Sequence, residues 1–236
     1  MIYLFDVLPK VFGIVDNVPV PVVVACWVAV AIAAYLLGSL NSAIIVSKWK
    51  WNQDIRNFGS GNAGLTNMHR VYGKDGAIYT LVGDIAKQVI SVLIGGIVMG
   101  RYGAYLAGGF CIIGHILPVY YGFKGGKGVL TAATMILVID PVIFAVLFVI
   151  FAVVLAITRY VSLSSIIAAI TYPAAITVAY GTAHAFEIFF ALFVGALVIY
   201  MHRTNLYRLF NGTESKFSFR KKPAVKETKD EPKEEK

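Results

Sequence analysis

Charged side chains are scarce in this sequence, and acidic ones are the scarcest. Only 14% of the 236 residues are charged, whereas 58% are hydrophobic. Soluble domains are usually about 45–50% apolar, so the composition excludes an ordinary soluble domain. The acids that precede residue 203 are few and scattered, with no cluster that could hold a metal ion. We therefore expect no metal and no cofactor.

Cysteine pairs, a basic N-terminal segment and a basic groove are also missing. Cys26 and Cys111 lie inside apolar runs without CxxC spacing, which indicates small buried hydrophobes and no disulfide. The opening MIYLFDVLPK has an acid before any base, so we predict no cleaved signal peptide. The net charge of +8 is not arranged as a basic patch with interleaved aromatics. Nucleic acid is therefore not expected as a partner.

Long apolar runs are what the sequence does have. A helix needs about 20 apolar residues to cross a bilayer. The apolar runs that we place in the membrane are 20–46, 77–98, 102–121, 129–139, 142–157, 163–180 and 185–200. The fourth covers only about 16 Å as a helix, so it is a partial span or begins in the glycine-rich segment before it. We predict an all-α polytopic membrane bundle of about seven transmembrane helices, forming a single domain over residues 1–214.

Lysine and arginine fall mainly in alternate connections between the runs. They lie in segments 48–76 and 122–128, at Arg159 and from residue 203 onward, whereas the opposing connections carry Arg101, Asp140 and Glu187. Short loops rich in these cations favour the cytoplasm. We therefore predict that the N-terminus is outside and the C-terminus is cytoplasmic. A five-pass arrangement with two of the weaker runs re-entrant is the alternative.

The last segment, residues 215–236, has few large apolar side chains and dense mixed charge. Such a segment cannot bury enough surface to fold, so we predict a disordered cytoplasmic tail. Its basic cluster at 220–222 either rests on anionic membrane lipid or is merely solvated.

The first polar element is NFGSGNAGLTNMHR, residues 57–70. It matches GxGxxG, but a dinucleotide site also needs a preceding buried strand and a following soluble helix, and the flanking residues fit neither. Its glycines let backbone N–H groups converge on an anion, and Arg70 supplies a fork that matches phosphate. The candidate binding residues are Gly59, Ser60, Gly61, Asn62, Thr66, Asn67 and Arg70. A flexible loop packed on helix ends is the alternative.

The second element is GHILPVYYGFKGGKGVLT, residues 114–131. It lacks the spacing of a Walker A loop, so ATP hydrolysis is not indicated. A Gly-Gly-Lys-Gly turn that opens into a helix is nevertheless a suitable anion site, with Gly125, Gly126, Lys127 and Gly128 as candidates. The alternative is that its lysines only orient the loop toward the cytoplasm.

Ionisable residues within the apolar runs form a further candidate group. Asp84 and Lys87 are three residues apart, and each costs about 2.5–3.5 kcal/mol inside a membrane. They either pair with each other or leave Lys87 near the mouth of a binding site. His115 is more typical of a hydrogen-bonded structural residue. In the third element, YMHRTNLYRLFNGTES, helical spacing lets His202 and Asn205 face one cleft.

Together, the three elements resemble the motifs of the bacterial membrane-embedded glycerol-3-phosphate acyltransferases that use acyl phosphate, over residues 18–216. GSGNAGLTN with Arg70 looks like the family's GSGNPGATN, GHILPVYYGFKGGKGVLTA looks like GHxFPVFxxFKGGKGVAT, and HRTNLYRL with Glu214 looks like the third motif. GSLNSA at Gly38 and SLSSI at Ser162 agree as well. The departures are Ala63, Leu65, Asn41 and Gln88, none of which is a charged site residue.

The resemblance implies transfer of a fatty acyl group from acyl phosphate to the 1-hydroxyl of sn-glycerol 3-phosphate, giving lysophosphatidate and phosphate. It implies catalytic roles for Ser60, Arg70, Lys127, His202 and Asn205, a structural role for Glu214, and Lys87 among the substrate-binding residues. It also implies the bacterial inner membrane, a site facing the cytoplasm, and no obligate protein partner.

Two other functions are compatible with a membrane bundle. A transporter or channel for a phosphorylated anion would place glycine-broken helices at the midplane, whereas the glycine-rich segments here cluster near one surface. A CDP-alcohol phosphotransferase would need a spaced acidic metal site, which is missing. The H-x4-D pattern of other glycerolipid acyltransferases is absent too.

Overall fold

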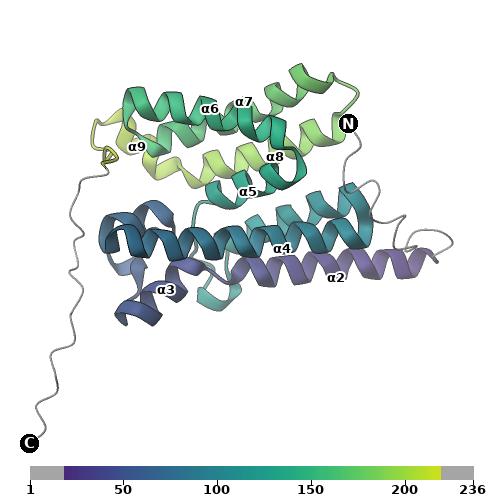
Figure 1. Ribbon diagram of the computed structural model, residues 1–236, viewed down its shortest axis with the longest axis horizontal. Coiled ribbons are helices and arrows are strands. Elements are labelled where there is room, and N and C mark those ends of the chain that lie inside the picture. The colour runs from purple at the N-terminus through teal and green to yellow at the C-terminus, as the bar shows by residue number, and fades with distance from the viewer. Residues whose placement is uncertain (1–18, 219–236) are drawn as a thin grey trace, which may run out of the picture.

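The computed structural model describes residues 19–218, which form helices and connecting turns (Figure 1). The helices are α2 (Val20–Ser39), α3 (Ser42–Trp51), α4 (Leu65–Ile116), α5 (Val129–Ile139), α6 (Pro141–Thr158), α7 (Val161–Tyr180), α8 (Ala185–Met201) and α9 (Arg203–Phe210). Two 3-10 turns, η1 (Ile55–Asn57) and η2 (Val119–Tyr121), lie in the connections. These residues contain no strand, and the prediction of an all-α protein is confirmed. Residues 1–18, with the predicted absence of a signal peptide, and most of the predicted tail lie outside the described residues.

The first predicted apolar run, 20–46, is divided between two helices. α2 ends at Ser39, and α3 begins after Asn41, whose side-chain Oδ1 accepts a hydrogen bond of 3.1 Å from the Ile44 backbone N–H. An asparagine in this position satisfies a backbone donor that the start of a helix leaves unpaired. Asn41 Nδ2 also donates to the Ala63 carbonyl at 3.2 Å. The break therefore helps to fix the loop that precedes α4.

α4 has 52 residues but is not one continuous helix, because the backbone is interrupted at two places. Gly73 and Gly100 have positive φ, 74° and 65°, which glycine adopts without steric cost. Around Gly100 the chain turns back on itself. The two halves of α4 then lie so close together that a Cβ on Gly95 would collide with the backbone of Gly103. The predicted runs 77–98 and 102–121 thus lie antiparallel to each other within α4.

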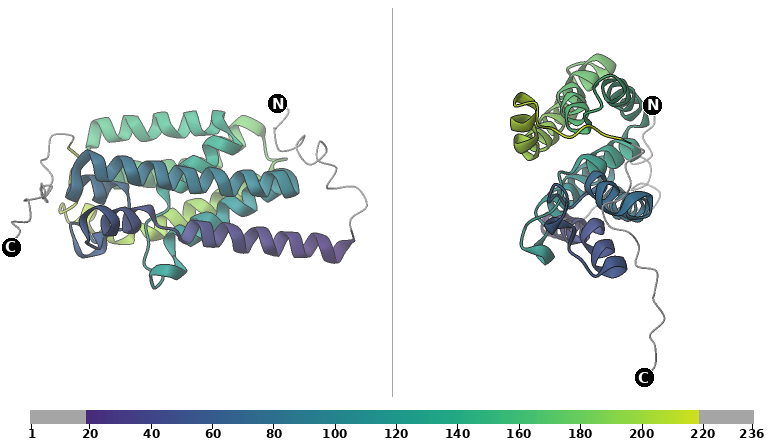
Figure 2. Two further views of the ribbon diagram at one scale, coloured as in Figure 1. Left: turned by 60° about the horizontal axis from the view of Figure 1, so that its bottom comes forward. Right: turned by 90° about the vertical axis from the view of Figure 1, so that its left-hand side faces the viewer.

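The helices form two layers with α5 between them. Helices α2, α3 and α4 make one layer, and α6, α7, α8 and α9 make the other (Figures 1 and 2). α5 contacts both α4 and α6. Glycines bring α2 against the second half of α4, since a Cβ on Gly38 would strike the Cys111 backbone and one on Gly114 the Tyr35 backbone. Close contacts through small residues are typical of membrane helices.

Four helical segments of the described residues are long and apolar enough to cross a membrane, namely Val20–Trp51, Leu65–Tyr121, Pro141–Thr158 and Val161–Tyr180. A fifth is counted if α8 and α9, which bend by 58°, form one span. The predicted count of seven differs for three physical reasons. Two predicted runs share α4, α5 has only 11 residues, and α8 has 17.

Candidate active site

A cavity of about 860 Å³ is lined by residues of both layers and of α5. Apolar side chains of α5, α6, α7 and α8 line a long groove in it. Polar side chains from segments 59–70, 127–128 and 202–218 line the rest, at the end of the bundle where Figure 1 shows α3 and α9. Pockets that combine apolar walls with a few convergent polar groups are the usual form of a small-molecule site. This cavity suits a molecule with a polar head and a long apolar tail.

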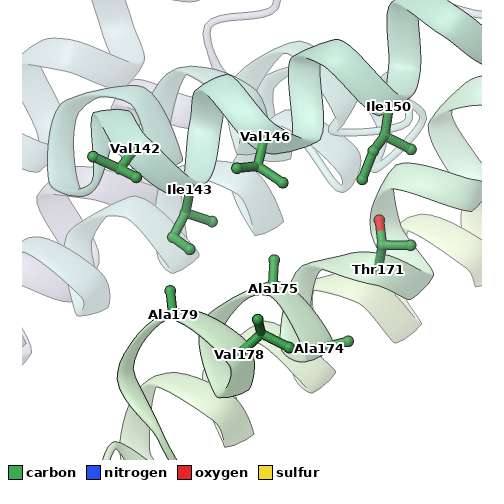
Figure 3. A pocket seen from close by; sticks show the side chains of 9 residues that line it. All are labelled: Val142, Ile143, Val146, Ile150, Thr171, Ala174, Ala175, Val178 and Ala179. Carbon is green, nitrogen blue, oxygen red and sulfur yellow. The ribbon is translucent and has the colours of Figure 1, made fainter.

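A smaller recess of about 280 Å³ lies between α6 and α7 (Figure 3). Its walls are Val142, Ile143, Val146 and Ile150 on α6 and Thr171, Ala174, Ala175, Val178 and Ala179 on α7. Thr171 alone among these nine is polar, and its hydroxyl already donates to the Ile167 carbonyl at 2.9 Å. The recess therefore offers no charged or free polar group, and the larger cavity is the candidate site.

A hydrogen-bonded chain joins the second polar element to the third. Lys127 Nζ donates to Asn205 Oδ1 at 2.6 Å, and Asn205 Nδ2 donates to Glu214 Oε1 at 2.7 Å. The same oxygen accepts from the Ser162 hydroxyl at 2.7 Å, while Arg208 Nε donates to Glu214 Oε2 at 2.7 Å. Glu214 thus holds Asn205 in place, and Asn205 in turn positions the Lys127 ammonium.

The surroundings of Lys127 and Glu214 lower the pKa values of both groups. Burial lowers the pKa of Lys127 to about 8, with Glu214 opposing this shift and Arg208 and Arg70 adding to it. Burial raises the pKa of Glu214, but hydrogen bonds from Asn205, Arg208 and Ser162 outweigh burial and leave that pKa below its usual value. Near neutral pH the site therefore holds an ammonium and an ionised carboxylate.

The loop before α4 is folded around the amide of Asn67. Its Nδ2 donates to the carbonyls of Phe58 at 2.9 Å and Asn62 at 3.0 Å, and its Oδ1 accepts from the Ser60 backbone N–H at 2.9 Å. The amide is buried and already bonded, so its evident task is to shape the loop. By contrast, neither the Ser60 hydroxyl nor the Arg70 guanidinium has a hydrogen-bond or ion-pair partner among residues 19–218. Both residues line the cavity.

The Gly-Gly-Lys-Gly turn packs against the end of α4. The backbone N–H groups of Gly125 and Gly126 donate to the carbonyls of Ile116 and His115, each at 3.1 Å. A Cβ on Gly126 would also collide with the His115 imidazole. These two N–H groups are therefore engaged, and the glycines allow the close approach that aims Lys127 at the cavity. The structure does not place either glycine in the cavity lining.

Lys87 is buried and braces the break between α2 and α3. Its Nζ donates to the carbonyls of Gly38 at 3.1 Å and Leu40 at 2.9 Å, and lies 2.9 Å from Asp84 Oδ1 and 3.0 Å from His115 Nδ1. The pairing of Asp84 with Lys87 is therefore present. Asp84 and His115 reach the cavity lining, whereas Lys87 does not.

His202 has one ring nitrogen engaged. Its Nδ1 lies 2.8 Å from the Val198 carbonyl. Because a carbonyl only accepts, Nδ1 carries the proton and Nε2 is an acceptor. His202 lines the cavity, so it can accept a hydrogen bond from a substrate hydroxyl there.

Comparison with known proteins identifies the family to which this chain belongs. The family profile described as Glycerol-3-phosphate acyltransferase matches residues 28–212. A relative of that name from Thermoanaerobacter sp. (strain X514) is 41% identical over 189 residues, covering 80% of this chain and 94% of the relative. Another from Clostridioides difficile (strain 630) is 40% identical over 201 residues, covering 83% and 97%. The chain belongs to the glycerol-3-phosphate acyltransferase family.

Solved structures agree with this assignment. The acyltransferase is similar to the crystal structure of PlsY (YgiH), an integral membrane glycerol 3-phosphate acyltransferase, in its glycerol 3-phosphate form, with a TM-score of 0.75 and 36% identity. That match covers 81% of this chain and 96% of PlsY. The lysphosphatidic acid form of PlsY gives a TM-score of 0.72 at 34% identity, covering 82% and 96%. The resemblance seen in the three motifs is confirmed.

Most of the predicted site residues of the acyltransferase meet in the one cavity. Those that line it are Gly59, Ser60, Asn62, Thr66, Asn67, Arg70, Lys127, Gly128, His202, Asn205 and Glu214. Gly61, Lys87, Gly125 and Gly126 lie outside its lining. Gly61 has a positive φ of 73°, so its position in the loop requires a glycine for backbone reasons alone. The individual roles of all these residues remain predictions.

Sequence reasoning missed several residues of the cavity. Ser162 and Arg208 hold Glu214, and residues 215–218 cross part of the cavity wall. The resemblance includes the SLSSI segment but assigns Ser162 no role, and 52 residues separate it from Glu214. The pairing of Arg208 with Glu214 had a local signal, since both lie in the third element.

Proposed function

We propose that this acyltransferase transfers a fatty acyl group from acyl phosphate to the 1-hydroxyl of sn-glycerol 3-phosphate, releasing lysophosphatidate and inorganic phosphate. The observation that carries the proposal is the division of the cavity into a long apolar groove and a cationic end. Both substrates carry a phosphate, and the donor also carries an acyl chain. The groove along α5, α6 and α7 fits the chain, and the cationic end fits the phosphates.

The chemistry we propose is direct transfer. The acceptor hydroxyl oxygen forms a bond to the acyl carbonyl carbon, the bond from that carbon to the phosphate oxygen breaks, and the hydroxyl proton leaves on phosphate. Arg70 and Lys127 stabilise charge on the departing phosphate, and His202 and Asn205 orient the acceptor. An acyl-enzyme would need a serine or cysteine activated by a base, but within residues 19–218 the Ser60 side chain is not hydrogen-bonded to a histidine.

The first experiment is a direct assay. Purified protein with palmitoyl phosphate and glycerol 3-phosphate, without acyl-CoA, is expected to form lysophosphatidate and phosphate in equal amounts. Replacing palmitoyl phosphate with palmitoyl-CoA should give no product. Product formed with palmitoyl-CoA but not with palmitoyl phosphate would show that the acyl donor is the thioester. Uptake of glycerol 3-phosphate into proteoliposomes, with no lysophosphatidate formed, would favour a transporter instead.

We also propose the membrane arrangement of this single domain, residues 1–214. Seven membrane segments, with the short α5 as a partial span, put the N-terminus outside and the three polar elements on the cytoplasmic face of the bacterial inner membrane. The basic connections support this orientation. Single cysteines at Asn57, Lys124 and Asn211, in a protein lacking Cys26 and Cys111, should resist an impermeant thiol reagent in intact cells.

The matched control for this labelling experiment is Thr182→Cys, which lies exposed in the opposing turn between α7 and α8. It is expected to react readily in intact cells. Labelling at Asn57 but not at Thr182 would show that the protein has the opposite orientation in the membrane.

A further inference from the structure

We propose that residues 215–218, which we call the C-terminal strap, are part of the substrate site. Lys216 binds a substrate phosphate, and Phe217 anchors the strap so that Lys216 stays at the cavity. This inference rests on the proposed function. The strap lies beyond residues 28–212, the part of the chain that matches the family profile, yet all four of its residues line the cavity.

The strap is attached to the layer formed by α6 to α9. It follows Glu214, which is bonded to Ser162, Asn205 and Arg208. The Phe217 backbone N–H donates to the Arg159 carbonyl, in the turn between α6 and α7, at 2.7 Å. These bonds direct the strap along the cavity instead of away from the bundle.

The side chain of Phe217 reaches the other layer. Its ring contacts the ring of His69, with centroids 5.5 Å apart and a tilt of 38°. His69 precedes Arg70 in the first turns of α4. The strap therefore joins the two layers beside the cationic end of the cavity, which is where substrate phosphates would bind.

Charge balance explains why a third cation is useful there. Two substrate phosphates that share one cavity repel each other, and a phosphate monoester carries about −1.5 to −2 charges at pH 7. Arg208 is neutralised by Glu214 at 2.7 Å, so among the described residues of the matched segment that line the cavity, Arg70 and Lys127 are the Lys and Arg side chains without a carboxylate partner. Lys216 adds a third at the cavity lining.

Lys216 is free to take up this role. Its side chain is exposed, and among the described residues its contact is with the Tyr160 ring, 5.7 Å from Nζ to the centroid. Such an exposed cation–π contact is weaker than a hydrogen bond between two charged groups. A phosphate would therefore displace the ring as the partner of Lys216.

The test is steady-state kinetics of Lys216→Gln with each substrate varied in turn. We expect the KM for one phosphorylated substrate to rise about tenfold, with kcat changed much less and with Lys216→Arg close to wild type. A raised KM for glycerol 3-phosphate assigns Lys216 to the acceptor, and a raised KM for acyl phosphate assigns it to the donor. Unchanged KM values for both substrates would overturn the proposal.

Two controls separate this proposal from other effects. Lys74→Gln removes an exposed lysine of the same polar face that does not line the cavity, so its KM values should equal those of wild type. An equal rise in Lys74→Gln would show only a general loss of charge. Phe217→Ala should raise the same KM as Lys216→Gln, because the strap loses its contact with His69, and Phe217→Tyr should restore it.

A failure of the proposed function gives a different result. Wild-type protein without lysophosphatidate formation would refute the function but not the strap. Calorimetric titration with glycerol 3-phosphate or inorganic phosphate then still compares Lys216→Gln with wild type. Weaker binding of either ligand to the variant supports the phosphate contact, and equal binding of both overturns it.

Discussion

Replacing Lys127 with methionine is expected to lower kcat/KM by at least about 100-fold, the usual effect of losing one preorganised donor to a developing anion. The ammonium is held at the cavity by Asn205, 2.6 Å away, and Asn205 is held by Glu214. Methionine fills similar space without the charge, so the fold should persist. Steady-state kinetics and thermal unfolding of the detergent-purified variant measure both effects.

The matched control is Lys124→Met in the same loop. Lys124 is exposed and does not line the cavity, so its loss should leave turnover unchanged. If Lys124→Met were as damaging as Lys127→Met, the role of these lysines would be orientation of the loop in the membrane and not binding.

The same lysine predicts a pH dependence. Its pKa is lowered to about 8 by burial, so the charge that binds phosphate is present below this pH and is lost as the pH rises through it. Because kcat/KM reports the free enzyme, it should fall above about pH 8. A phosphate monoester has its second pKa near 6, so the acceptor does not titrate in this range. In Lys127→Arg the decline should disappear, since arginine stays protonated; an unchanged decline would assign it to another group.

The polar elements were predictable because their chemistry is local in sequence. Gly59, Ser60 and Arg70 lie within a dozen residues, and the loop that they form lines the cavity as expected. The helical spacing of His202 and Asn205 likewise places both on the cavity. Patterns of this kind depend on backbone freedom and short-range geometry, which the residue order determines directly.

Partners that are distant in the chain were not predictable in the same way. The Lys87 ammonium donates to the carbonyls of Gly38 and Leu40, which are 49 and 47 residues away. Because every residue has a backbone carbonyl, the sequence does not indicate which carbonyls accept. Gly125 and Gly126 predict that the backbone approaches another segment closely, but they do not identify that segment. The structure gives the end of α4 as that partner, through Ile116 and His115.

The helix count shows a third kind of limit. Hydropathy locates apolar runs but does not show where an apolar helix breaks, and Asn41 divides the first run by a capping bond that composition does not reveal. The turn at Gly100 had a clearer signal in the Gly-Arg pair between two runs. The strap was missed because its residues look like the start of a charged tail. Its packing is visible in the structure, for example in the contact with His69 and the bond to Arg159.

Replacing Arg70 with lysine is expected to lower kcat/KM by roughly 10- to 100-fold even though the positive charge remains. The Arg70 guanidinium lines the cavity and has no hydrogen-bond or ion-pair partner within residues 19–218, so its donors are available to a substrate. A guanidinium holds two phosphate oxygens at once through its planar fork, whereas an ammonium acts as a single point charge.

The test for Arg70 compares three variants with wild type. Arg70→Ala should lose more activity than Arg70→Lys, because both the fork and the charge are removed. Arg203→Lys is the matched control, since Arg203 is exposed, stacks over the Tyr200 ring at 4.5 Å and does not line the cavity. Its activity should equal that of wild type. Near-normal turnover by folded Arg70→Ala protein would contradict a phosphate-binding role for Arg70, and full activity of Arg70→Lys would show that charge alone suffices and that the fork makes no second bond.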